Sequence, residues 1–260
     1  NDVACSGAEI IGIMLTILLP DRTLEDELSK IMSDVHDVCH DLNIQVIGGH
    51  TEVTGVVNQP LISVTGVGKV KEDRLLSTGK ITPGMDIVMT KAIGLEGTSI
   101  LAKEKYEELI KHFPVGMIDK AADFDKDILI VREATVARDL AVSMHDVTEG
   151  GIFGALWEIA EASDVGLDIE LKSIKVRQET IEICEYFGIN PYKLISSGCL
   201  LIAGEDGGKI VEALDNDGIE ATVIGKATAS NDRRLLNGDE VRFLETPAKD
   251  ELYQVIGGRE

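Results

Sequence analysis

Three short segments combine carboxylate, imidazole or hydroxyl side chains with glycine, and each could bind an ion. The first, NDVACSGAE, covers residues 1–9 and places Asp2 at the start of a predicted short helix. A carboxylate in this position could hold Mg²⁺, a hard cation that prefers oxygen ligands and often accompanies phosphates. An ordinary helix cap would explain the same residues.

The second segment, GGHTEV at residues 48–53, follows an apolar strand that we expect to end at Ile47. Its paired glycines let backbone amides approach a ligand closely. His50 and Glu52 could then serve as a catalytic base or as metal ligands at the end of the strand. A tight turn with solvated polar side chains is the alternative.

The third segment, HDVTEGGIFGALWEIAEAS, covers residues 145–163 and carries the strongest signal. Asp146 and Thr148 precede Gly150 and Gly151, which lead into an apolar helix. A glycine-rich helix start binds anions, because its free N–H groups and the helix dipole point at the ligand. Asp146 would add the metal ligand that an anionic nucleotide requires. Capping of the helix by Asp146 or Thr148 is the alternative.

The net charge limits the ligands that the protein can bind. The 260 residues include 46 acidic and 25 basic side chains, for a formal charge of -21. Non-specific binding to nucleic acid or anionic lipid needs clustered Lys and Arg. The composition therefore excludes nucleic-acid and membrane-surface partners, except for a polyanion that is carried in by a metal ion.

Neither a membrane span nor a disulfide framework is expected. The longest apolar stretch, residues 10–19, is shorter than the ~20 residues of a spanning helix. No basic residue precedes it, as one would in a secretory leader. The four cysteines lie far apart without a C-x-x-C pair, which predicts reduced, buried thiols. We therefore expect a cytoplasmic protein.

Strand-like and helix-like stretches alternate, which predicts an α/β or α+β layered fold. The length suits two domains, and the Gly- and Pro-containing segment 77–84 is the expected boundary. We place the domains at residues 1–80 and 81–246, followed by a tail at 247–260. The clearest amphipathic helix covers residues 24–42. Further helices are expected within 98–139 and at 151–162, 178–187 and 206–215, and strands at 10–19, 44–47, 61–70, 86–90, 167–171, 199–203, 221–224 and 241–244.

Taken in order, these segments resemble the superfamily of aminoimidazole ribonucleotide synthase, the hydrogenase maturation factor HypE, selenophosphate synthetase and thiamine monophosphate kinase. NDVACSGAE resembles its N-D-x-x-x-x-G-A-x-P helix start, with Ile10 at the usual proline. GGHTEV resembles its G-G-[DEH]-T turn, and HDVTEGG its [HRM]-D-x-[ST]-x-G-G turn. The order of elements from EIAEASDVGLDIEL to ICEYFGINPYKLISSGCLLIA is most similar to the HypE branch.

The resemblance implies a two-domain, PurM-like α/β fold with mixed sheets and flanking helices. Its first domain would contribute strands to a barrel shared within a homodimer. The implied activity is that of an ATP- and Mg²⁺-dependent, HypE-like maturation factor, which activates an amide or thiocarboxamide oxygen by phosphorylation and works with a maturation-factor protein partner. The implied roles are metal binding by Asp2 and Asp146, nucleotide binding by Thr148, Gly150 and Gly151, and catalysis by His50 and Glu52.

Two departures from the superfamily pattern leave alternatives open. The chain ends in VIGGRE without a cysteine-bearing tail, and it begins at the N-D helix, upstream of which the superfamily has a nucleotide-binding segment. We therefore expect an upstream segment to be missing and the first domain to be incomplete. The alternatives are a non-catalytic dimeric scaffold of the same fold, and an aminoimidazole ribonucleotide synthase or thiamine monophosphate kinase activity.

Overall fold

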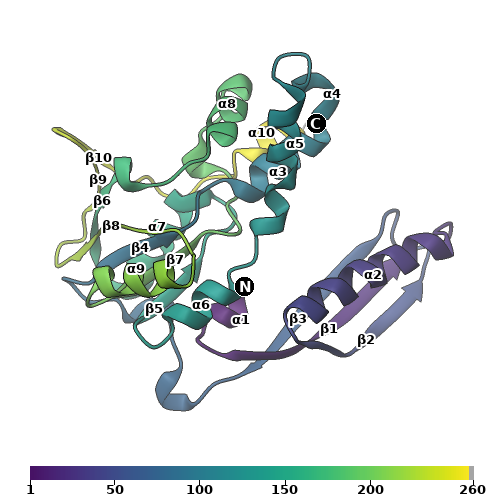
Figure 1. Ribbon diagram of the computed structural model, residues 1–260, viewed down its shortest axis with the longest axis horizontal. Coiled ribbons are helices and arrows are strands. Elements are labelled where there is room, and N and C mark those ends of the chain that lie inside the picture. The colour runs from purple at the N-terminus through teal and green to yellow at the C-terminus, as the bar shows by residue number, and fades with distance from the viewer. Residues whose placement is uncertain (258–260) are drawn as a thin grey trace. The chain divides into compact units, whose positions relative to one another are not determined.

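The computed structural model describes residues 1–257, which form two compact units (Figure 1). The smaller unit is Ala8–Leu75. The larger unit combines Asn1–Gly7 with the chain from Leu76 onward. Each unit has its own sheet and flanking helices, which confirms the predicted mixed α/β fold. No helix within residues 1–257 has the length and apolar content to cross a membrane.

The smaller unit is a three-stranded sheet in the order β2-β1-β3. Its elements are β1 (Glu9–Leu19), α2 (Glu25–Asp41), β2 (Gln45–Val53) and β3 (Leu61–Lys69). β1 runs parallel to β2 and antiparallel to β3, and α2 lies along one face of the sheet (Figure 1). Alternate apolar residues of β1 meet the apolar stripe of α2, as expected for an amphipathic helix on a sheet. This small core consists of Leu15, Ile17, Leu19, Leu28, Ile31 and Val35.

The GGHTEV segment lies inside β2, and the expected end of the strand at Ile47 was therefore wrong. The strand continues because these residues pair with β1, as His50 does with Thr16. Gly49 permits the pairing, since a Cβ there would lie 1.9 Å from the carbonyl oxygen of Leu15. The glycine thus serves a close approach of two strands.

The larger unit is built on a seven-stranded sheet in the order β10-β9-β6-β8-β4-β7-β5. Neighbouring strands are antiparallel, except that β6 and β9 are parallel. The sequence predicted neither β5 nor β9. The strands are β4 (Asp86–Thr90), β5 (Ser143–Asp146), β6 (Gly166–Glu170), β7 (Leu200–Gly204), β8 (Ala221–Thr228), β9 (Arg233–Asn237) and β10 (Glu240–Phe243).

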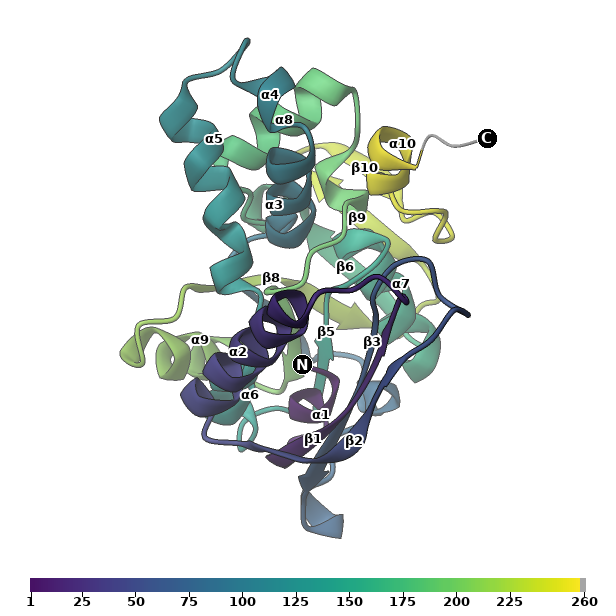
Figure 2. The ribbon, with the colours of Figure 1, turned by 90° about the vertical axis from the view of Figure 1, so that its right-hand side faces the viewer.

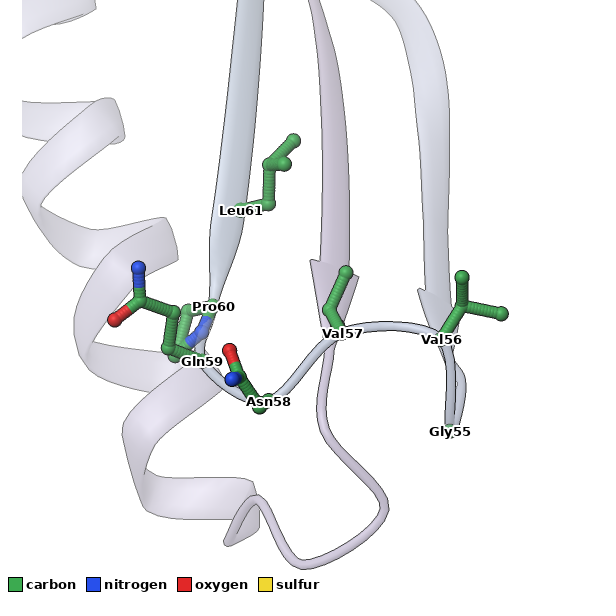
Figure 3. Close-up of a pocket in the computed structure, with 7 residues that line it drawn as sticks. All are labelled: Gly55, Val56, Val57, Asn58, Gln59, Pro60 and Leu61. Carbon is green, nitrogen blue, oxygen red and sulfur yellow. The ribbon is translucent and has the colours of Figure 1, made fainter.

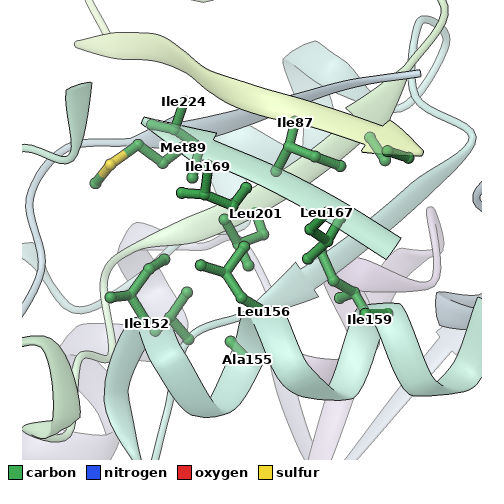
Figure 4. Packing of buried hydrophobic residues seen from close by; sticks show 14 of the residues in the cluster. Ile87, Met89, Ile152, Ala155, Leu156, Ile159, Leu167, Ile169, Leu201 and Ile224 are labelled. Carbon is green, nitrogen blue, oxygen red and sulfur yellow. The ribbon is translucent and has the colours of Figure 1, made fainter. Parts of the chain in front are cut away.

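Helix α7 (Gly151–Ser163) buries its apolar face against this sheet (Figure 4). Ile152, Leu156 and Ile159 lie against Ile87 and other apolar residues of the central strands. Strand residues alternate between the two faces, and the neighbouring Asp86 contacts the first turn of α9 (Gly207–Asn216) instead. Helices α7 and α9 therefore cover opposite faces of the sheet.

Most of the remaining helices of the larger unit form a group of their own, apart from the short N-terminal helix. Figure 2 shows α3 (Leu95–Glu104), α4 (Tyr106–Leu109), α5 (Val115–Ala122) and α8 (Gln178–Phe187) grouped together. With α10 (Leu252–Ile256), they enclose an apolar cluster of their own. The short α1 (Asp2–Cys5) contacts β5 and α6 (Val131–Ala137).

Candidate functional site

The structure brings together Asp2 and Asp146, which lie far apart in the sequence. Asp2 is the first residue of α1, and Asp146 is the last residue of β5, which α1 contacts. Asp146 is 9% exposed, and the thiol of Cys5, also in α1, lies 3.8 Å from its Oδ1. Burial raises the pKa of Asp146, and the negative charge and side-chain hydrogen bond of Asp2 raise it further. A buried carboxylate whose ionised form is disfavoured by a neighbouring carboxylate is a chemically suitable place for a cation.

This carboxylate pair fits Mg²⁺, which prefers hard oxygen ligands. Among residues 1–257, no three His, Cys, Asp or Glu side chains gather into a complete metal cage. Mg²⁺ usually takes one or two protein carboxylates and completes its shell with water and substrate phosphates. Asp2 and Asp146 therefore match a magnesium ion that arrives with a nucleotide, and they do not match a structural metal.

Neither carboxylate caps a helix, which was the alternative explanation for both motifs. In the described chain, α1 has Asn1 at its N-cap and α7 has Gly150, and no side chain forms a cap hydrogen bond at either helix. The side chains of Asp2, Asp146 and Thr148 are therefore left for other interactions.

The glycine turn before α7 is held by internal hydrogen bonds. The exposed Thr148 accepts at its carbonyl oxygen from Gly151 N at 3.1 Å. Gly150 N donates to Oδ2 of Asp250 at 2.7 Å. Gly151 has a φ of +62°, and a Cβ there would lie 2.6 Å from the carbonyl oxygen of Tyr192. Both predicted phosphate-binding amides thus have protein acceptors, and an anion at Gly150 would take the place of the Asp250 carboxylate.

His50 and Glu52 lie in the smaller unit, on β2. His50 Nε2 and Glu52 Oε2 are 3.2 Å apart, and their side chains are 64% and 55% exposed. Residues paired across strands share a face of the sheet. His50 pairs with Thr16, which alternates with the α2-facing Leu15 and Ile17. The imidazole and carboxylate therefore lie on the face opposite α2, and their catalytic role stays a prediction.

Glu96 is a candidate that sequence reasoning missed. Its Oε2 is buried and has no hydrogen-bond partner among residues 1–257. Glu96 lies in the first turn of α3, where Gly94 N donates to the Ser196 hydroxyl at 2.7 Å. Ser196 N in turn donates to the carbonyl oxygen of Thr148, which links this helix start to the glycine turn. The only signal in the sequence is the run G-L-E-G shortly after β4.

Two open hollows lie elsewhere. One, of about 380 Å³, is formed by the loop between β2 and β3, whose residues 55–61 line it (Figure 3). The other, of about 490 Å³, lies beside the ends of β4 and β8 and is lined by charged residues that include Lys175, Arg177 and Glu220. Within the described chain, no residue predicted for the site lines either hollow.

The fold and the carboxylate pair define a two-unit α/β protein in which two carboxylates lie beside a glycine-rich helix start. Two family models match the chain: the N-terminal domain of AIR synthase related proteins at residues 1–70, and their C-terminal domain at residues 82–236. The chain belongs to the AIR synthase related protein family.

The curated relatives include hydrogenase maturation proteins. A Methanocaldococcus jannaschii protein that is named for hydrogenase expression and formation is 28% identical over 233 residues, which cover 88% of this chain and 67% of the relative. The carbamoyl dehydratase HypE of Azotobacter vinelandii is 27% identical over 259 residues, which cover 95% and 70%.

Solved structures share the fold. The E. coli HypE structure aligns with a TM-score of 0.83 at 21% identity, covering 98% of this chain and 79% of that chain. A HypE structure in complex with ATP aligns with a TM-score of 0.80 at 17% identity, covering 97% and 78%. A HypE–HypF complex aligns with a TM-score of 0.78 at 21% identity, covering 95% and 81%.

Proposed function

We propose that this chain is an ATP-dependent hydrogenase maturation factor of the HypE type, which activates an amide or thiocarboxamide oxygen by phosphorylation. The observation that carries the proposal is the pairing of Asp2 with the buried Asp146 in the larger unit. Relatives named carbamoyl dehydratase HypE and the ATP complex of a HypE with this fold support the nucleotide.

In this proposal Asp2 and Asp146 would hold Mg²⁺, which would supply charge neutralisation for the nucleotide phosphates. Thr148 presents its exposed hydroxyl to the phosphates, and the N–H of Gly150 becomes available where Asp250 gives way to them. For the smaller unit we propose that His50 and Glu52, joined by a 3.2 Å contact, are the groups that exchange a proton in catalysis.

We further propose that the protein is a cytoplasmic homodimer that works with a second maturation protein. The smaller unit supports the dimer, because both edge strands of its sheet are open and apolar side chains such as Met14, Leu61 and Val64 are exposed. Open edges and uncovered apolar surface favour pairing with another chain. The solved HypE–HypF complex supports the second partner.

Calorimetric titration tests the nucleotide site. ATP with Mg²⁺ should bind the full-length protein, and ATP with EDTA should bind at least about tenfold more weakly. Asp146→Asn should abolish the Mg²⁺-dependent part, because the variant keeps the shape of the side chain and loses its charge. Its melting temperature should stay nearly unchanged, since Asp146 caps no helix.

Asp206→Asn is a matched control. Asp206 caps α9 just after the last residue of β7, whereas Asp146 pairs with the first residue of β7. We expect it to bind ATP and Mg²⁺ like the wild type. If the wild type gives no heat with ATP and Mg²⁺ at millimolar concentration, the enzyme proposal is wrong and a non-catalytic scaffold is favoured.

A further inference from the structure

A buried ion pair lies at the carboxyl end of β4, outside the candidate site. Lys91 follows β4 directly, and its Nζ lies 2.6 Å from Oε1 of Glu133 in α6. The two side chains are only 16% and 7% exposed. The desolvation cost of such a pair can exceed the gain from its Coulombic attraction. A contribution to stability is therefore a poor explanation for this ion pair, and we consider instead that it positions the neighbouring backbone.

Lys91 also binds the backbone that leads into α6. Its Nζ donates to the carbonyl oxygens of Asp127 at 2.9 Å and of Leu129 at 2.6 Å. With Glu133, these acceptors use all three N–H groups of the ammonium. The backbone of Lys91 has a φ of +51°, a left-handed conformation that is costly for a residue with a side chain. The contacts with Glu133, Asp127 and Leu129 thus hold the ammonium in place although the backbone of Lys91 is in a costly conformation.

Asn1 binds the same stretch of backbone through its side chain. Its Nδ2 donates to the carbonyl oxygen of Ile128 at 2.9 Å, and its Oδ1 accepts from Ile130 N at 3.1 Å. Asn1 is also the N-cap residue of α1. Its side chain therefore joins the residue directly before Asp2 to the segment 128–130.

We propose that Lys91, Glu133 and Asn1 form a tether that places Asp2 beside Asp146. Lys91 and Glu133 hold the segment 127–130, and this segment holds Asn1. All three are positioning residues that act through Asp2. The role of the tether rests on the proposed function, because it positions a proposed metal ligand. The contacts that form the tether involve neither nucleotide nor metal.

A double variant tests the tether without leaving a single charge buried. Lys91→Met with Glu133→Gln removes both charges and keeps the side-chain volumes similar. Lys120→Met with Glu179→Gln is the matched control: this 2.5 Å ion pair also has a buried carboxylate, but it joins α5 to α8. Both variants lose one ion pair of the same unit, and only the first loses the tether.

Two readouts follow the position of α1. The first is the alkylation rate of Cys5 by N-ethylmaleimide, mapped by peptide mass spectrometry, because this thiol is buried against Asp146 while α1 is docked. The second is Mn²⁺ affinity in the presence of ATP, measured by electron paramagnetic resonance. Groups that orient metal ligands change metal affinity by about 10- to 100-fold when removed.

We expect the tether variant to alkylate at Cys5 about tenfold faster and to bind Mn²⁺ about 10- to 100-fold more weakly. The control variant should match the wild type in both. An unchanged alkylation rate, or an unchanged Mn²⁺ affinity in a protein that binds Mn²⁺, would overturn the proposal.

Two further outcomes of the experiment also test the proposed tether. If the double variant does not fold by circular dichroism, Asn1→Ala provides the same test, since it leaves the ion pair in place. If the wild type does not bind Mn²⁺ at all, the proposed function fails, and the Cys5 rate still decides whether the tether positions α1.

Discussion

Asp86 joins three parts of the larger unit through one carboxylate. Its Oδ1 lies 2.6 Å from Nζ of Lys226 in β8, and its Oδ2 accepts from Gly207 N at 2.9 Å, at the start of α9. The Lys226 hydrogen bond, and then the Gly207 N–H, lower the pKa of Asp86. A carboxyl group whose pKa is lower in the folded state stabilises the fold above its unfolded pKa of about 4, and this stabilisation is lost as pH falls through the folded pKa.

Asp86→Asn should therefore destabilise the protein in a pH-dependent way. At pH 7 we expect the free energy of unfolding to fall by about 1.5–3 kcal/mol, the range for hydrogen bonds to a charged group. At pH 3 the difference should shrink, because this pH lies below the unfolded pKa of about 4 and the unfolded wild-type chain binds a proton at Asp86. Urea unfolding at the two pH values measures both quantities.

Asp215→Asn is the control, since this exposed carboxylate lies on the same α9. It should change stability by less than about 0.5 kcal/mol. An Asp86→Asn effect of equal size at pH 7 and pH 3 would show that the charge of Asp86 contributes nothing.

At the scale of elements, the start of α7 depends on a backbone that only glycine allows. Gly151 has a φ of +62°, and its Cα faces the backbone of Tyr192 and Leu194. Gly151→Ala combines left-handed strain with a Cβ 2.6 Å from a carbonyl oxygen. We expect a loss of about 2–4 kcal/mol in the free energy of unfolding by urea.

Gly188→Ala separates these two costs. Gly188, at the end of α8, has a similar φ of +67°, but no atom lies within 4 Å of the position of an added Cβ. The loss there should be about 1–2 kcal/mol, from the backbone conformation alone. Equal losses in the two variants would contradict the close approach at Gly151.

Elements with strong local patterns were predicted well, and those that depend on distant partners were not. The helix expected at 24–42 is α2, and the strand expected at 61–70 is β3, because periodicity and length are local properties. The missed β5 has four residues and becomes a strand by pairing with β7. The glycines of GGHTEV suggested a turn, whereas the neighbouring β1 keeps them in a strand.

At the scale of the whole molecule, Met14 tests the proposed dimer. Met14 lies on β1, the central strand of the smaller sheet, and is nevertheless 43% exposed. A second copy on this sheet would bury it. Met14→Lys should then raise the dimer dissociation constant at least about tenfold, since a lysine in an apolar interface loses its hydration. Sedimentation velocity over a concentration series measures this shift.

Val241→Lys, on β10 of the larger unit, is a control with a similarly exposed side chain. It should sediment like the wild type. A wild type that is monomeric at tens of micromolar would rule out the dimer, and a Met14→Lys variant as dimeric as the wild type would place the interface elsewhere.

The sequence by itself determined the α/β class, the family motifs and the strongly periodic elements, because composition, spacing and local periodicity carry that information. Through the family resemblance it also identified Asp2 and Asp146 together as the expected metal ligands. Only the tertiary structure decided that Asp146 is buried against α1, and that Asp250 accepts the hydrogen bond of Gly150. Such contacts join residues more than a hundred positions apart in some cases, and strand pairing and helix packing set them in ways that local pattern does not encode.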